Sequence, residues 1–442
     1  MVIRCEGEFA QAEIRRRNLS RMLRGLHLGG PMSRSDLAIH LKLHRSTVAS
    51  LVSELVDRKL VLERSRTKVL PQAPGRPSPV VELRRDGPVA LAVDLSTDWI
   101  GAAVIGLGGA VVTSTRFERS LANTDPERIV DEIHDLVESM LAGLRDGPRI
   151  VAIGVSIPGA VRAEDGHVVH APNLGWQNVP LGSLIYKRFA SLGVPVFVGN
   201  DADLAASAEH LRGSGRGSND FICLWGEGGI GAGFVTDGHA LGGSAGFAGE
   251  VGHLTVDPDG DLCHCGSRGC WEAEVGEEAL LRRSGRDPLG GTAAVADLLA
   301  AADRGDEVAL AALTESGRWL GIGIAGLVNI FNPSRVALGG LFARIYPYAK
   351  EALLRELNSR AMPAGRGMVE VTTAQLGADA LLIGASELAF ASILHDPTTV
   401  PLSGDSDSVD VRRQASPPQD RWIRAQRAQG GGNRLEFSGN FP

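Results

Sequence analysis

The sequence predicts an α/β protein in which a small, mainly helical domain precedes a larger body made of two similar halves. Three observations support this fold class. Apolar residues recur at helical spacing within residues 1–60. From Pro88 onward, short apolar runs typical of strands lead into an amphipathic segment of helical length. A similar order of strands and helices recurs after residue 220, and 442 residues are enough for two or three domains.

Residues 1–85 are predicted to form the first domain, which carries an excess of positive charge. They hold 17 Lys and Arg residues against 8 Asp and Glu, whereas the whole chain carries 45 against 52. The remainder of the chain is therefore acidic. A basic segment attached to an acidic body is typical of a protein that binds nucleic acid at one end only.

Apolar spacing in this domain predicts three helices. The first ends at Gly29, Gly30 and Pro31, and the pair Ser33 and Asp36 forms a capping box that begins the second. The third helix begins after the turn L-K-L-H. The apolar stripes expected to face the core are Leu19, Met22, Leu23 and Leu26 in the first helix and Val48, Leu51, Val52 and Leu55 in the third.

The second and third helices are typical of a helix-turn-helix. The first turn and polar face of the third helix carry short polar groups and one Arg, which suits a DNA major groove. The runs at 60–65 and 80–83 predict a hairpin wing with Arg76 near its tip. A helical domain that contacts another protein is the alternative, and the concentrated positive charge disfavours it. The expected DNA-binding residues are Arg34, Arg45, Ser46, Thr47, Ser50 and Arg76.

The body is predicted to span residues 86–397, with lobes at about 88–199 and 200–376 and a C-terminal helix at 377–395. In the first lobe we expect strands at 89–95, 100–105 and 111–116, a helix at 126–144 and a strand beginning near residue 149. The second lobe repeats this order, with strands at 221–225 and 230–236 followed by helices that run through 321–331. Such a repeat places ligands where the carboxyl ends of the strands meet.

A cluster of cysteines in the second lobe indicates a metal site. Cys263, Cys265 and Cys270 fall within eight residues, and His253 precedes them on a segment that we expect to be a strand. A Cys3His set suits a structural Zn2+, whose binding orders a loop that has almost no apolar core. A disulfide with one spare thiol is the alternative; a reducing cytosol and the strain of a short Cys-x-Cys loop disfavour it.

The motif C-x-C-G-x-x-G-C-x-E, matched in full from Cys263 to Glu272, resembles that of the ROK family of sugar kinases and repressors. The upstream runs G-G-I-G-A-G and A-G-E-V-G-H add to the resemblance, which covers roughly residues 12 to 397. The resemblance implies a two-lobed actin-like (ribonuclease H-like) ATPase/sugar-kinase fold for the body. It also implies a winged helix-turn-helix, in which Arg76 can enter a narrow minor groove.

The resemblance further implies a sugar site. Asn200 and Asp201 match a pair in which the Asp accepts a proton from the sugar hydroxyl that is phosphorylated, so Asp201 would be the general base of an active kinase. Carboxylates and amides suit a polyol because they hydrogen-bond vicinal hydroxyls. His253 would contact both metal and sugar. The implied sugar-binding residues are Gly159, Asn173, Asn200, Asp201, Glu250, His253 and Glu272.

Two loops depart from the kinase pattern that the resemblance implies. Kinases of the family carry Asp-x-Gly-Gly-Thr in the first phosphate loop, where this chain has D-L-S-T-D from Asp94 to Asp98. The second phosphate loop, normally Gly-Thr-Gly, begins here with Glu227 and lacks the Thr. Glycines let backbone N–H groups approach phosphates, and extra carboxylates repel them. We therefore expect no phosphoryl transfer, although Asp201 remains.

The sequence thus predicts a repressor of carbohydrate metabolism whose binding to a palindromic double-stranded DNA operator is modulated by a sugar or sugar phosphate. A homodimer would occupy two half-sites about one helical turn apart, or a small multiple of it, and pairing into tetramers stays open. One alternative is an active ATP-dependent hexose or amino-sugar kinase with an appended DNA-binding domain. The other is a dimeric scaffold whose DNA binding responds to a protein partner.

Two further expectations concern the compartment and the tail. No apolar run approaches the length that spans a bilayer, and the N-terminus lacks the apolar core of a signal peptide, so we expect a cytoplasmic protein without membrane contact. Cys5 and Cys223 are expected to be free thiols, the latter in a buried strand. Residues 398–442 are poor in apolar residues, which predicts disorder.

Overall fold

The computed structural model describes residues 2–65, 78–144, 147–244 and 246–402, with side chains from residue 11 onward. Arg76 at the predicted wing tip, the side chain of Cys5 and most of the predicted tail lie outside the described residues. The chain forms two compact units. One comprises the residues up to Gly87, the segment Ala163–Asp165 and the residues from Phe390 on. The other comprises Pro88–Arg162 and Gly166–Ala389, so the last helix begins in this second unit and ends in the first.

The N-terminal unit is a winged helix-turn-helix, as predicted. Its three helices are joined to a small antiparallel sheet of order β1-β3-β2. Both predicted apolar stripes are buried, and the predicted capping box of Ser33 and Asp36 begins the second helix. Its elements are α1 (Val2–Gly29), β1 (Met32–Ser33), α2 (Arg34–Leu41), α3 (Arg45–Asp57), β2 (Val61–Arg64) and β3 (Val80–Leu83).

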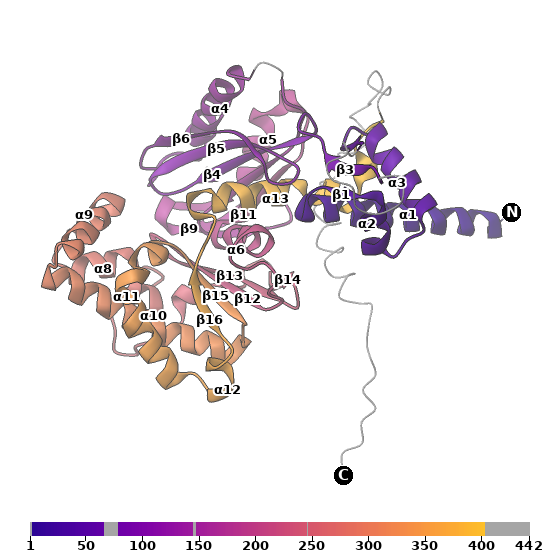
Figure 1. Cartoon of the computed structure of the whole chain (residues 1–442). Helices are drawn as coiled ribbons and strands as arrows, with labels where there is room; N and C mark the ends of the chain where they lie inside the picture. The colour runs from indigo at the N-terminus through magenta and orange to yellow at the C-terminus, as the bar shows by residue number, and fades with distance from the viewer. Residues whose placement is uncertain (1, 66–77, 145–146, 245, 403–442) are drawn as a thin grey trace, which may run out of the picture. The chain divides into compact units, whose positions relative to one another are not determined.

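The first lobe of the body is built on a five-stranded sheet of order β11-β7-β4-β5-β6 (Figure 1). Helices α4 and α5 cover one face, where the apolar residues of α4 pack against every second residue of β4. A smaller sheet of order β10-β9-β8 adjoins it. The elements are β4 (Val89–Leu95), β5 (Trp99–Gly106), β6 (Val111–Glu118), α4 (Pro126–Ala142), β7 (Ile150–Ile157), β8 (Ala160–Arg162), β9 (His167–Ala171), β10 (Trp176–Val179), α5 (Leu181–Arg188) and β11 (Val196–Asn200).

The second lobe repeats this plan with a five-stranded sheet of order β14-β13-β12-β15-β16. The long helices α10 and α11 pack on its outer face and contribute nearly half of the residues of the larger core cluster. The elements are α6 (Asp201–Arg212), β12 (Phe221–Glu227), β13 (Gly229–Thr236), β14 (His239–Ala240), α7 (Trp271–Val275), α8 (Glu277–Arg283), α9 (Gly291–Asp303), α10 (Glu307–Phe331), β15 (Arg335–Gly340), α11 (Leu341–Arg360), α12 (Pro363–Arg366), β16 (Glu370–Thr373) and α13 (Ala380–His395).

Helices α6 and α13 form a layer that both sheets share. One face of this layer packs against small and branched residues of β4 and β5, and the other packs against β12 and β15. Figure 1 shows α6 and α13 between the two sheets. A rearrangement of one lobe against the other must therefore act on these two helices, because packed layers slide as units.

The stretch Gly377–His395, which contains α13, corrects the expectation about apolar runs. By length and composition it could cross a membrane, but 67% of its 18-residue apolar window is buried within the structure. A buried core helix meets the same criteria. The sequence pattern missed this stretch because its apolar residues surround Glu387 instead of forming an unbroken run.

Candidate functional site

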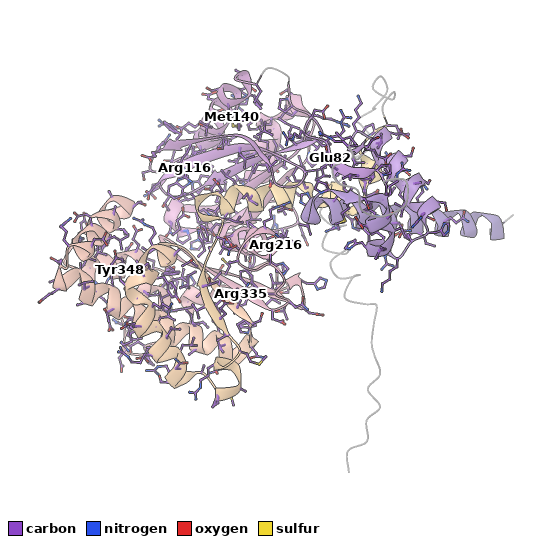
Figure 2. All side chains as sticks on the ribbon, viewed as in Figure 1. Glu82, Arg116, Met140, Arg216, Arg335 and Tyr348 are labelled. Carbon is purple, nitrogen blue, oxygen red and sulfur yellow. The ribbon has the colours of Figure 1, made fainter. Side chains whose placement is uncertain are left out.

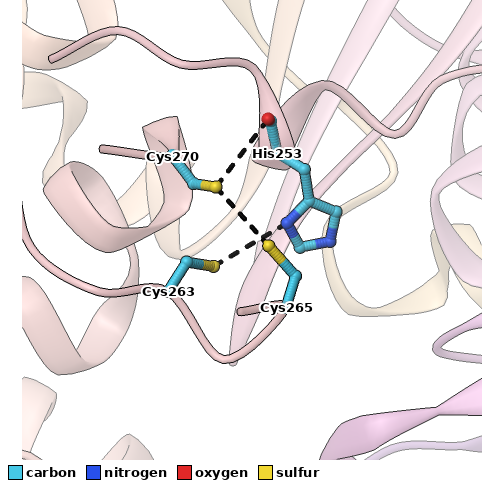
Figure 3. A group of neighbouring side chains, drawn as sticks. All are labelled: His253, Cys263, Cys265 and Cys270. Atoms are coloured by element: carbon cyan, nitrogen blue, oxygen red, sulfur yellow. Dashed lines mark hydrogen bonds between the residues drawn. The ribbon is translucent and has the colours of Figure 1, made fainter. Parts of the chain in front are cut away.

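His253, Cys263, Cys265 and Cys270 gather into one cluster, with one ligand atom from each within 4.8 Å of all the others (Figure 3). The Sγ atoms of Cys265 and Cys270 lie 3.6 Å apart, and Cys263 Sγ lies 3.8 Å from His253 Nδ1. Four ligands at Zn–S distances of about 2.3 Å would be separated by roughly 3.8 Å in a tetrahedron. The donor set and its spacing therefore fit a four-coordinate metal, and all three cysteines are free thiols.

The loop that carries the cluster is shaped by a glycine and a short helix. His253 ends a 3-10 helix, Val251–His253, which corrects the expectation that it lies on a strand. Gly269 has a φ of 68°, and a Cβ there would lie 1.5 Å from the carbonyl oxygen of Asp257. Only glycine fits that position. The resulting turn brings Cys270 to the other thiols.

Glu272 connects the cysteine loop to the second phosphate loop. Its Oε2 accepts a hydrogen bond of 2.9 Å from the backbone N–H of Ile230, and Cys263 Sγ lies 3.9 Å from its Oε1. A Cβ on Gly229 would lie 2.2 Å from this carboxylate, so a glycine there leaves room for it. The position of the β12–β13 turn therefore depends on the cysteine loop.

Three of the implied sugar residues meet at the end of β11. Asn200 caps α6 by accepting from the N–H of Asp203 at 3.1 Å, and its Nδ2 donates to the carbonyl of Gly159 at 3.0 Å. Asp201 follows as the first residue of α6 and accepts from the N–H of Ala202 at 2.8 Å. Both polar side chains are thus fixed by the helix N-terminus.

The other implied sugar residues lie in short helical segments or cap them. Asn173 is exposed, and its Nδ2 would lie 3.2 Å from a Cβ on Gly228, so it reaches the second phosphate loop. Glu250 and His253 are exposed, which leaves their polar atoms accessible to a hydroxylated ligand. Asp203 was not predicted from the sequence; burial and the nearby Glu250 raise its pKa to about 7. The acidic repeat at the first turn of α6 was the available signal.

The two phosphate loops contact each other directly. The hydroxyl of Ser96, in the first loop, donates a hydrogen bond to Oε1 of Glu227, in the second. Trp225 Nε1 donates to the other oxygen of Glu227 at 3.1 Å. Ser96 and Glu227 stand at the positions where the kinase pattern has glycines. Their side chains therefore occupy space that, in the kinase pattern, is open for a ligand to approach the backbone. The tryptophan partner was not anticipated from the sequence.

Near this contact, burial raises the pKa values of three carboxyl groups, those of Asp94, Asp201 and Glu227. Burial raises the pKa of Asp94, and burial together with Glu227 raises the pKa of Asp201 well above its usual range. Burial and Asp94 raise the pKa of Glu227 to about 7. Trp99 Nε1 donates to Oδ2 of Asp94 at 2.9 Å, while the buried Oδ1 of Asp94 has no hydrogen-bond partner among the described residues. A phosphate group here would meet this acidic cluster.

Arg116 on β6 opposes part of this charge. Its guanidinium lies over the ring of Trp99, 4.5 Å from the ring centre, and its positive charge lowers the pKa values of both Asp94 and Glu227 (Figure 2 labels Arg116). Burial outweighs this effect, because it is the largest influence on both groups and their pKa values are raised. The acidic cluster remains poorly suited to an anionic nucleotide.

Replacing Glu227 by Gln is expected to stabilise the protein above pH 7. The pKa of Glu227 rises from 4.5 to about 7 on folding, so the folded state prefers the protonated form and stability falls as pH rises through this range. The full penalty is present above pH 7, and removing it is worth up to about 3 kcal/mol. Denaturant unfolding at pH 5 and pH 8 measures it. Exposed Glu351→Gln is the control, and a Glu227→Gln variant less stable than wild type at pH 8 would contradict the expectation.

The DNA-facing candidates that the structure describes lie around α3. Arg45, Ser46, Thr47 and Ser50 are exposed, as a groove-reading face requires. Ser50 accepts a hydrogen bond of 3.1 Å from Arg15 of α1, while Arg34 forms a two-pronged ion pair with Glu63 of β2. Arg45 therefore has the clearest access to a ligand.

Comparisons with known proteins match the body to one family and most of the chain to regulators of that family. The family model described as "ROK family" matches residues 90–392. The xylose repressor of Bacillus spizizenii is 28% identical over 385 residues, covering 87% of this chain and 97% of the repressor. A crystal structure of a ROK family transcriptional regulator, a homologue of the E. coli MLC protein, matches with a TM-score of 0.72 and 28% identity over 87% of this chain and 97% of that one. A ROK glucokinase from Streptomyces griseus, solved with glucose and AMPPNP, has a TM-score of 0.58 and 30% identity over 68% of this chain and 99% of the kinase.

Proposed function

Because the chain belongs to the ROK family, we propose that it is a sugar-responsive transcriptional repressor of carbohydrate metabolism. A sugar held by the body changes the affinity of the winged helix-turn-helix for a palindromic operator. The observation that carries this proposal is the presence, on one chain, of that DNA-binding unit and of a body whose phosphate loops are joined through Ser96 and Glu227. The DNA-binding unit would bind the operator, and the joined phosphate loops argue against phosphoryl transfer.

The relatives support this choice by how much of the chain they share. The alignments with the xylose repressor and the ROK regulator span 87% of the chain, whereas the glucokinase spans 68%. Residues 88–442 make up only about 80% of the chain, so alignments that span 87% must include part of the N-terminal unit. The names of these relatives put xylose and glucose first among the sugars to test.

The Cys3His cluster is proposed to hold a structural Zn2+. Four protein ligands leave no open position, so the ion would supply no reaction step and would instead order the loop. His253 directs Nδ1 toward the thiols, which leaves Nε2 at the opposite side of the ring for a sugar hydroxyl. Glu272 would then link metal, loop and sugar through its bond to Ile230.

We propose a homodimer as the unit that binds DNA. A palindromic operator has two-fold symmetry, and two identical reading units held by one body would match it. The cytoplasm, where operator and sugar are both present, is the corresponding location.

An active sugar kinase is the second candidate, and one observation favours it. Asp201 stands at the start of α6, and burial and the nearby Glu227 raise its pKa, which makes its carboxylate more basic than an ordinary Asp, as a general base requires. The acidic cluster and the filled first loop oppose this candidate, since phosphoryl transfer depends on neutralising charge.

A binding and turnover experiment separates the two. Calorimetry with xylose, glucose and amino sugars is expected to find one sugar that binds without nucleotide. With ATP and Mg2+ added, ADP formation is expected to equal that of a sample without sugar. Sugar-dependent ADP formation that disappears in Asp201→Asn would establish the kinase instead.

A further inference from the structure

Helix α6 extends from the implied sugar site to a second, buried contact. The helix begins at Asp201, where Asn200 caps its first turn. It ends at Arg212, about 18 Å away along its 12 residues. Any displacement of the helix at the sugar site is therefore carried to Arg212, because a helix of this length moves as a rigid element.

Arg212 joins α6 to α13 through an ion pair that is almost fully buried. Its Nε and Nη2 both lie 2.6 Å from Oε1 of Glu387, and its Nη1 donates to the carbonyl of Gly108 at 2.7 Å. The side chains of Arg212 and Glu387 are only 14% and 4% exposed. A Cβ on Gly109 would lie 2.7 Å from Arg212 Nε, so the β5–β6 turn closes tightly over the guanidinium.

The contacts of α13 with the body leave little room for independent movement. A Cβ on Gly384 would lie 2.2 Å from the carbonyl oxygen of Leu204 in α6. On the other side, a Cβ on Gly154 of β7 would lie 1.9 Å from the carbonyl oxygen of Ala385. Backbone thus meets backbone at both places, and a shift of α6 must be followed by α13.

The far end of α13 belongs to the DNA-binding unit, within which it contacts α1 directly and the end of α3 through the segment that follows it. The hydroxyl of Ser20 donates to the carbonyl of Leu394 at 2.6 Å. Arg58, the C-cap of α3, donates from Nη1 to the carbonyls of Thr398 and Val400 at 3.0 and 2.5 Å. The segment that follows α13 is therefore attached to the end of the predicted recognition helix.

We propose that Arg212 and Glu387 are positioning residues that transmit sugar occupancy from α6 to α13 and so to the recognition helix. This inference rests on the proposed function, since it requires a sugar that acts on operator binding. Neither residue contacts the expected operator or belongs to the implied sugar set. Their removal is therefore expected to uncouple the two binding events without abolishing either.

The test measures the coupling factor, defined as the ratio of operator Kd values with and without saturating sugar. In the double variant Arg212→Met, Glu387→Met, this factor is expected to fall at least about fivefold toward 1, within the ordinary range of coupling. Sugar affinity without DNA and operator affinity without sugar should each stay within about threefold of wild type. By reciprocity, the effect of operator on sugar Kd falls by the same factor. A merely structural role would lower Tm and leave the factor unchanged.

Two further variants complete the experiment. The pair Arg119→Met, Glu132→Met removes a partly buried ion pair in the first lobe, with side chains 21% and 22% exposed, that joins neither α6 nor α13, and it should retain the wild-type factor. If the first double variant does not fold, Glu387→Gln, which keeps the shape of the side chain, is expected to lower the factor in the same direction.

A folded variant of the Arg212–Glu387 pair that retains the wild-type factor within about twofold overturns the inference alone. A wild-type protein whose operator Kd ignores every sugar overturns the proposed function as well.

Discussion

Replacing Cys270 by Ser is expected to remove the metal and, with it, the response to sugar. Cys270 is buried beside Cys265, and Trp271, which follows it, is fully buried against Gly323. A structural Zn2+ contributes its binding free energy to folding of the loop, so losing one ligand should cost at least about 3 kcal/mol of stability. Zinc content should fall from about one equivalent to near zero. Elemental analysis, thermal unfolding and Trp fluorescence measure these changes.

His264→Ala is the matched control for this variant. His264 lies between Cys263 and Cys265 in the same loop, is exposed, and is paired with Glu278 instead of the thiols. Its removal should leave zinc content and sugar response unchanged. The metal's proposed role would be wrong if Cys270→Ser lost its zinc and still responded normally to sugar.

Replacing Arg45 by Ala is expected to weaken operator binding by between about 5- and 150-fold at fixed salt. Arg45 begins α3, is exposed, and makes no hydrogen bond or ion pair with the described side chains. An Arg that reaches a base edge contributes about 1 to 3 kcal/mol, which corresponds to this range. Fluorescence anisotropy on labelled operator DNA, compared at two salt concentrations, measures the effect.

Arg304→Ala controls for the loss of one positive charge. Arg304 is an exposed cation that follows α9 in the body, and its removal should change operator Kd by less than about twofold. An Arg45→Ala variant with wild-type operator affinity would show that α3 does not read the groove. The DNA-binding face would then have to be sought elsewhere on the unit.

The N-terminal unit could be predicted almost completely from sequence because its signals are local. Apolar spacing placed the core faces of α1 and α3, and Ser33 with Asp36 marked the start of α2. The repeated strand order similarly indicated the two lobes. These features depend on residues that are close in sequence, where periodicity and capping rules apply.

The contacts between distant segments could not be predicted. Sequence indicated that Glu227 adds charge to a phosphate loop, but the bond to Ser96 joins residues 131 positions apart. The donation from Trp225 depends on side-chain direction within β12. His253 was expected on a strand, because nothing in its neighbours distinguishes a short 3-10 helix from an extended segment.

The boundary between the two compact units is another feature that the sequence did not predict. From the sequence, the whole helix 377–395 was expected to belong to the body, whereas the compact units divide it between Ala389 and Phe390. Composition is uniform along this helix, so only tertiary packing distinguishes its two ends. The proposed transmission through Glu387 depends on that division.

The proposed repressor requires that a sugar, acting without phosphoryl transfer, controls operator binding. It is tested most directly by anisotropy of the wild-type protein on the DNA upstream of its own gene, at fixed salt, titrated with pentoses, hexoses and amino sugars in the absence of nucleotide. We expect one sugar to shift the operator Kd by about 5- to 150-fold, the usual range for coupled sites. Operator binding that no sugar alters would contradict the claim and favour control by a protein partner.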